Sequence, residues 1–137
     1  MPATNSIKTY VSNSYYHLYN RGVEKREIYQ DQHDYAVFLS YIKSYLLPKD
    51  TSNLKMTLGS SKFSSKEKTK AAQLLRLNNF SGEIELQCFS LLPNHFHLLV
   101  RQTTADAIDR FLNSLATRYT KYFNQKYHRI GKLYQGV

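Results

Sequence analysis

The chain has 137 residues, which fits one domain that is long enough to bury a hydrophobic core. Hydrophobic residues make up 42% of it and charged residues 21%, which argues against a disordered chain, and no apolar run approaches the roughly 20 residues of a membrane helix. Lysine and arginine outnumber aspartate and glutamate by 19 to 10, and this net charge of +9 favours a polyanionic partner, although a solvated basic surface would give the same composition.

Location and redox chemistry follow from what the sequence lacks. Residues 1–13 are polar and contain no signal-peptide core, so we expect a cytoplasmic protein without a membrane partner. The single cysteine, Cys88, excludes an internal disulfide and a cysteine-based zinc cage. Because it lies in an apolar run, we interpret it as a small buried hydrophobic residue.

The first predicted elements are a strand and a helix. Residues 14–20 are aromatic-rich and alternate, which is typical of a strand. Asp31 is a suitable N-cap for a helix that Pro48 ends. The apolar residues of this helix recur at helical spacing: Tyr35, Phe38, Leu39, Ile42 and Tyr45.

The segment 49–82 is rich in serine, lysine, threonine and asparagine. A Ser-Ser-Lys-Glu start predicts a short helix over residues 65–77. We interpret the whole segment as a polar insertion across the surface of a single domain. Either a solvated charged loop or an arm that contacts DNA is compatible with its composition, and the loop is the simpler interpretation.

The second half of the chain predicts a hairpin and a long helix. Residues 84–92 and 95–101 alternate as strands on either side of Pro93-Asn94, which is typical of a turn. A helix should begin at 104–106 and continue to the region of Gly131, after which residues 132–135 resemble a starting strand. This order predicts an α+β fold, with an antiparallel sheet that has helices packed on one face.

His95-Phe96-His97 is the strongest chemical signal in the chain. Side chains alternate along a strand, so both imidazoles should project from one face while Phe96 points to the other. Two imidazoles so placed can share a divalent metal. The spacing alone is equally compatible with two histidines on a solvated strand face.

The surrounding residues resemble the HUH signature of single-tyrosine transposases of the REP-associated and insertion-sequence type. Four blocks carry the resemblance in the family's order: residues 16–22, 91–100, 119–124 and 131–136. It implies a ferredoxin-like or RRM-like nuclease core that binds Mg²⁺ or Mn²⁺ through His95 and His97. It also implies cleavage and rejoining of single-stranded hairpin DNA through a 5′-phosphotyrosine.

The resemblance also places the nucleophilic tyrosine and a third metal ligand on a helix after the last strand. That helix would follow Val137, so we expect a C-terminally truncated core that forms no covalent DNA adduct. Tyr127, between Lys126 and His128, is the in-chain alternative as nucleophile.

Other residues have more than one interpretation. His17 shares a strand face with Tyr19 and could lie beside the histidine pair if the first strand neighbours the third. It would then be a ligand or, more simply, a hydrogen-bonded structural histidine, whereas His33 and His128 are expected at the surface. The basic residues nearest the family-like blocks are candidate phosphate contacts: Arg21, Lys25, Arg26, Arg118, Lys121 and Lys132.

Two further hypotheses stay open. A basic, tyrosine-rich sheet could bind single-stranded nucleic acid without cleaving it, and base stacking needs no divalent ion. An unpaired sheet edge would favour a homodimer.

Overall fold

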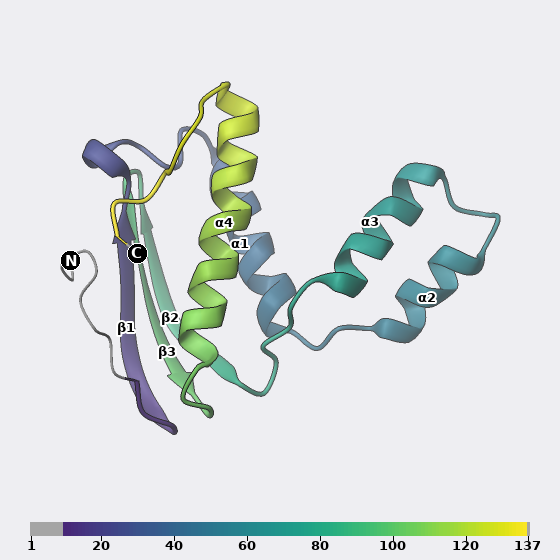
Figure 1. Ribbon diagram of the computed structural model, residues 1–137, viewed down its shortest axis with the longest axis horizontal. Coiled ribbons are helices and arrows are strands. Elements are labelled where there is room, and N and C mark those ends of the chain that lie inside the picture. Colours follow the sequence, from purple (N-terminus) through teal and green to yellow (C-terminus); the bar gives the residue numbers. More distant parts are fainter. Residues whose placement is uncertain (1–9, 137) are drawn as a thin grey trace.

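The computed structural model describes residues 10–136, so the polar N-terminal segment is covered only from Tyr10 onward. The described residues have the predicted α+β architecture. A three-stranded antiparallel sheet has the order β1-β3-β2, with β1 at Ser14–Arg21, β2 at Ile84–Leu92 and β3 at His95–Gln102. Helices α1 (Gln32–Leu46) and α4 (Ala107–Tyr127) cover one face of this sheet (Figure 1).

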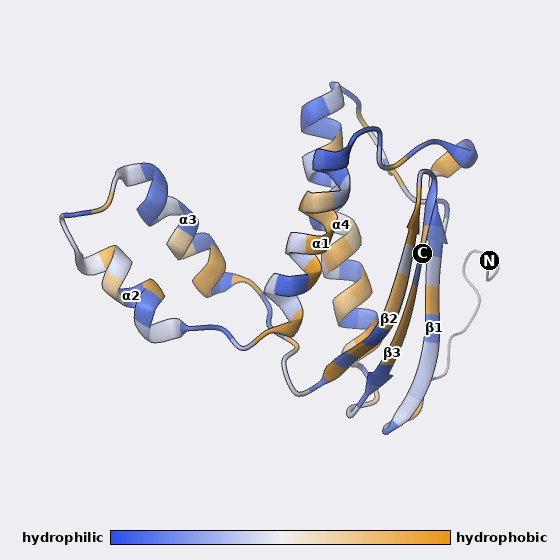
Figure 2. Cartoon of the chain, turned by 180° about the vertical axis from the view of Figure 1, so that it is seen from behind, coloured by the Kyte–Doolittle hydropathy of each residue, from blue (hydrophilic) through white to orange (hydrophobic). Residues whose placement is uncertain are grey.

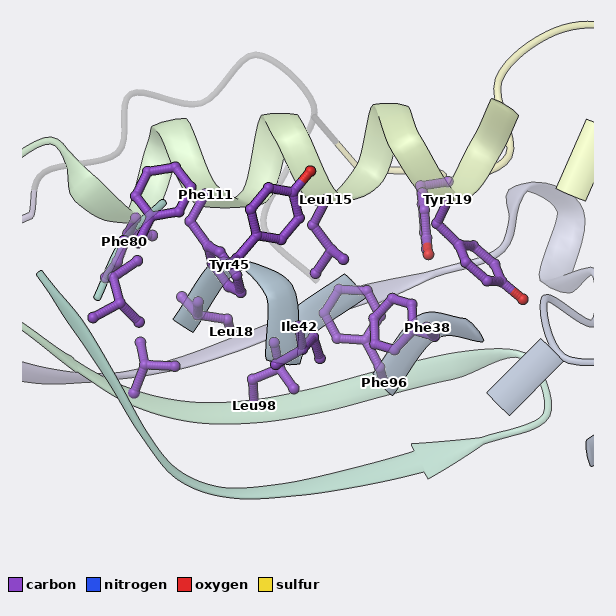
Figure 3. Packing of buried hydrophobic residues seen from close by; sticks show 14 of the residues in the cluster. Leu18, Phe38, Ile42, Tyr45, Phe80, Phe96, Leu98, Phe111, Leu115 and Tyr119 are labelled. Atoms are coloured by element: carbon purple, nitrogen blue, oxygen red, sulfur yellow. The ribbon is translucent and has the colours of Figure 1, made fainter. Parts of the chain in front are cut away.

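The core lies between the sheet and these two helices, as the alternation in β3 predicts. Phe96, Leu98 and Val100 are buried, whereas Leu99 between them is exposed. Figure 3 shows side chains of β1 and β3 meeting those of α1 and α4, with aromatic rings in the middle. The fully buried helix residues include Phe38, Tyr45, Phe111, Leu115 and Tyr119.

The helix starts follow the predicted capping residues. Asp31 accepts a hydrogen bond from the backbone N–H of Asp34 and begins α1, as predicted. At the start of α3 (Ser65–Arg76), Ser64 and Glu67 form a reciprocal capping box. Helix α4 ends at Tyr127, before Gly131, because His128 adopts a left-handed conformation with φ of 53°.

The insertion is largely helical, so its interpretation as a solvated charged loop is wrong. It contains the predicted helix α3 and an additional helix, α2 (Thr51–Gly59), which packs against it. Figures 1 and 2 show this helical pair standing away from the sheet and the other helices. Helix α2 was not predicted because its residues show little hydrophobic periodicity and it is stabilised by packing against α3.

Cys88 is exposed, so its interpretation as a buried residue is wrong. A register shift between Leu86 and Cys88 interrupts the alternation of β2. Cys88 then pairs with Leu99, on the face of the sheet that the helices do not cover. An apolar run in an edge strand therefore did not place this side chain in the core.

The segment after α4 returns to the sheet beside β1. A β-bridge joins Gly22 and Tyr134, and the N–H of Gln135 donates to the carbonyl of Arg21 over 2.8 Å. Where a strand was predicted over 132–135, the described residues thus form a single β-bridge. None of the helices between residues 10 and 136 is long and apolar enough to cross a membrane.

Candidate metal and DNA site on the open sheet face

The face of the sheet opposite α1 and α4, here called the open face, carries both histidines of the His-Phe-His segment. They project from the central strand β3 with ring centroids 5.0 Å apart, while Phe96 between them is buried in the core. The predicted same-face orientation is confirmed. Burial, followed by the nearby His97 and Arg21, lowers the pKa of His95.

His17 lies beside this pair because β1 neighbours β3. Its Nε2 is 2.7 Å from Nδ1 of His97, and the two rings stack with centroids 4.9 Å apart. Tyr19 pairs with His97 in the strand register and stacks on His17, with centroids 4.8 Å apart. The conditional placement of His17 is therefore confirmed, and it is a hydrogen-bonded histidine.

These contacts leave ring nitrogens available on both histidines of β3. Nδ1 of His95 is 2.6 Å from Oδ1 of Asn94, an atom that only accepts, so this nitrogen carries the proton and Nε2 keeps its lone pair. If Nδ1–H of His97 donates to His17, Nε2 of His97 is free as well. In this tautomer each ring can offer Nε2 to a cation, oriented by a hydrogen bond on the opposite nitrogen.

The candidate phosphate contacts Arg21, Lys25 and Arg26 lie at the same end of the sheet as His95. Arg21 pairs with His95 across the strands, and its guanidinium donates to Oε1 of Gln135. Lys25 and Arg26 are exposed in the loop that follows β1, which is hydrogen-bonded to the turn before His95. Lys25 and Arg26 are therefore exposed beside the turn that precedes His95, whereas the side chain of Arg21 is hydrogen-bonded to Gln135 in the C-terminal segment.

Arg118 is placed differently from the other candidates. Its guanidinium stacks on the ring of Tyr41 in α1, 3.9 Å from the centroid. It thus belongs to the helical layer, on the other side of the sheet from the histidines.

Lys121 and Lys132 line a cleft of about 600 Å³ along the outer edge of β1. The cleft is bounded by β1, α4 and the segment after α4, and its lining includes His17 and Tyr19. It thus connects two lysines with the histidine group at the edge of the open face.

A second polar cluster joins the start of α1 to the end of α4, and the sequence did not indicate it. The buried carboxylate of Asp34 accepts hydrogen bonds from Tyr122, Lys126 and Tyr127. Burial alone would raise the pKa of Asp34, but these hydrogen bonds and one from the Gln30 N–H outweigh it and lower the pKa to about 2. The available signal was the spacing of the three donors on one face of α4.

The same cluster contains Asp31, His33 and Asp34, whose ligand atoms lie within 4.8 Å of one another. Lys126 already donates to both carboxylates, at 2.8 Å each, and His33 contacts the hydroxyl of Tyr122. The lysine ammonium therefore stands where a metal would have to bind, and the cluster is a structural ion pair. His33 and His128 are exposed, as expected.

The sequence comparisons identify a family. A family model described as "Transposase IS200 like" matches residues 60–137, more than half of the chain. The match includes the β2–β3 hairpin with His95 and His97, and all of α4. No curated protein and no solved structure matches the chain. Since the matched part carries the histidine strand and the helix that packs behind it, the chain belongs to the family of IS200-like transposases.

Proposed function

We propose that this transposase binds single-stranded hairpin DNA on its open face. Mg²⁺ or Mn²⁺ held by His95 and His97 would support cleavage and rejoining through a 5′-phosphotyrosine. One observation carries the proposal. Two imidazoles project from the central strand on the uncovered face, each with Nδ1 in a hydrogen bond, and Nε2 is available on both rings when Nδ1 carries the proton. A core or capping role accounts for neither ring.

The donor set fits a metal that also binds phosphate. Two neutral imidazoles bring no negative charge, and Mg²⁺ and Mn²⁺ prefer oxygen ligands. The phosphate oxygens of DNA would complete the set, so the ion and the substrate should bind together. When bound, the ion would polarise the scissile phosphate and offset its charge. The residues of the chain hold the rings in place through Asn94 and His17.

Basic and aromatic side chains around the histidines support DNA as the ligand. Lys25 and Arg26 are exposed at one end of the sheet, and Lys121 and Lys132 line the cleft beside β1. Tyr15, on the same face as His17, is 62% exposed and can stack on an unpaired base. The phosphate backbone can thus be neutralised on both sides of the histidine pair.

We further propose that Tyr127 is not the nucleophile. It belongs to α4, on the covered face of the sheet, and its hydroxyl donates to Asp34. Burial, and then this hydrogen bond, raise the pKa of Tyr127, which disfavours the phenolate.

Mn²⁺ binding in the presence of single-stranded hairpin DNA tests the proposal. Electron paramagnetic resonance of free Mn²⁺ should show binding to the unaltered chain and its loss in His95→Ala and His97→Ala. His128→Ala, which removes an exposed histidine at the end of α4, is the matched control. Equal binding by all four proteins would overturn the metal assignment.

A non-catalytic single-strand-binding module is the second candidate. The exposed ring of Tyr15 and the ring of Tyr19, both on the open face, favour it, because stacking needs no ion. Fluorescence anisotropy with and without EDTA separates the two functions. Affinity for single-stranded DNA that does not change on chelation would support the module, whereas weaker binding would support the metal site.

A further inference from the structure

The insertion forms a helical arm, defined here as residues 49–77, whose base is fixed to the core. Nζ of Lys49 donates to the carbonyls of Leu75 and Leu77, which joins the two ends of the arm. Nδ2 of Asn79 donates to the carbonyls of Ser44 and Leu47 in and after α1. The arm is thus a positioned structure that projects from the body, as Figure 1 shows.

More than half of the net charge of the chain lies in this arm. It has seven cationic and two acidic residues, a net charge of +5 out of +9. The cations are Lys49, Lys55, Lys62, Lys66, Lys68, Lys70 and Arg76. A short segment with this excess has a strongly positive potential, which attracts polyanions.

The two acidic residues of the arm do not neutralise it. Asp50 accepts from the N–H of Asn53, and Glu67 is part of the capping box with Ser64, so both are used at helix starts. Every ion pair among the described residues joins side chains outside the arm. Apart from Lys49, which joins the two ends of the arm, the cations of the arm therefore keep their charge available, whereas Arg110 and Lys126 in the body are paired.

Three of the seven cations lie along one exposed side of α3. Ala71 is the buried residue of α3, and the side of the helix opposite it is exposed. That exposed stripe contains Lys66, Thr69, Lys70, Gln73 and Arg76. It extends over roughly 15 Å at about 1.5 Å per residue. It has no aromatic side chain on which an unpaired base could stack.

We propose that the arm binds the double-stranded stem of a DNA hairpin through phosphate contacts. A duplex carries about one charge per 1.7 Å of its axis, so several phosphates lie within the length of the stripe. Lysines contact phosphates as point charges and read no sequence, so the contact is independent of base sequence. The inference rests on the proposed function, because it assigns the stem to the arm and the unpaired strand to the open face.

The test compares two variants of equal net charge. Lys70→Gln removes one charge from the stripe. Lys43→Gln removes one from an exposed position of the body. The probes are a labelled blunt hairpin with a stem of about 10 base pairs, roughly one helical turn, and an unpaired oligonucleotide of the same length. Circular dichroism verifies that both variants fold.

On the hairpin, the arm variant should make the plot of log affinity against log salt less steep by about 0.9, the contribution of one phosphate contact. Its binding to the unpaired oligonucleotide and the hairpin binding of the body variant should stay near those of the unaltered chain. Equal losses of hairpin affinity in both variants, or no loss in the arm variant, would overturn the proposal.

Mn²⁺ binding is measured on the same proteins. If the arm variant loses stem binding and the unaltered chain binds no Mn²⁺, the proposal for the arm is supported and the metal-dependent function is rejected.

Discussion

Nε2 of His17 lies 2.7 Å from Nδ1 of His97, across two neighbouring strands of the sheet. If Nδ1–H of His97 donates in this contact, His17 is a positioning residue for the proposed metal site, because Nε2 of His97 is then free. His17→Ala should therefore weaken Mn²⁺ binding about 10–100-fold, in the range for loss of a partner that orients a metal ligand. The measurement is titration of the DNA-bound protein with Mn²⁺. His33→Ala is the control, and equal affinities in the two variants would contradict the role of His17.

Asp34 should stabilise the fold in a pH-dependent manner. Asp34→Asn should lower the free energy of unfolding by about 1.5–3 kcal/mol near neutral pH, the range for hydrogen bonds to a charged group. Its pKa of about 2 in the folded protein is below the ordinary value of 3.8, so the stabilisation is present above about pH 4 and is lost as the pH falls through 2. Denaturant unfolding of both proteins should show their difference narrowing over this window. Asp109→Asn, at an exposed position of α4, is the control.

Gly22 should not tolerate a side chain. A Cβ added there would lie 2.2 Å from the carbonyl oxygen of Arg26 and 3.0 Å from Ile28, so backbone would have to move. Gly22→Ala is expected to lower the free energy of unfolding by about 1–3 kcal/mol, as in other overpacked sites. Gly59→Ala, where no atom lies within 4 Å of the added Cβ, should be neutral or slightly stabilising. Thermal unfolding of the two variants gives the comparison, and equal melting temperatures would refute it.

Tyr127 should contribute to stability and not to chemistry. Tyr127→Phe removes one donor from Asp34 and should lower the free energy of unfolding by about 1 kcal/mol. Any covalent adduct formed with labelled single-stranded hairpin DNA and Mn²⁺ should be unchanged by this substitution. Denaturing gel electrophoresis detects the adduct. A shifted band that disappears in Tyr127→Phe would make Tyr127 the nucleophile, and one that disappears in Tyr19→Phe would assign the tyrosine stacked beside His17.

Local patterns in the sequence were sufficient for much of the fold. The alternation around Pro93-Asn94 predicted the β2–β3 hairpin, and the same alternation placed His95 and His97 on one face. Asp31 and the Ser64–Glu67 pair predicted two helix starts. These features depend on residues that lie within a few positions of one another, so the chain itself contains the information.

Other features depend on contacts between segments far apart in the chain. The bond between His17 and His97 requires that β1 lies next to β3, and the Asp34 cluster requires that the start of α1 meets the end of α4. Helix α2 depends on α3, and the exposure of Cys88 depends on a bulge in an edge strand. The sequence alone determined which side chains share a strand face or a helix turn, because side-chain direction follows backbone periodicity. Only the tertiary structure decided which of these faces meet. Strand order and helix packing depend on the free energy of the whole core, and no single position in the sequence specifies them.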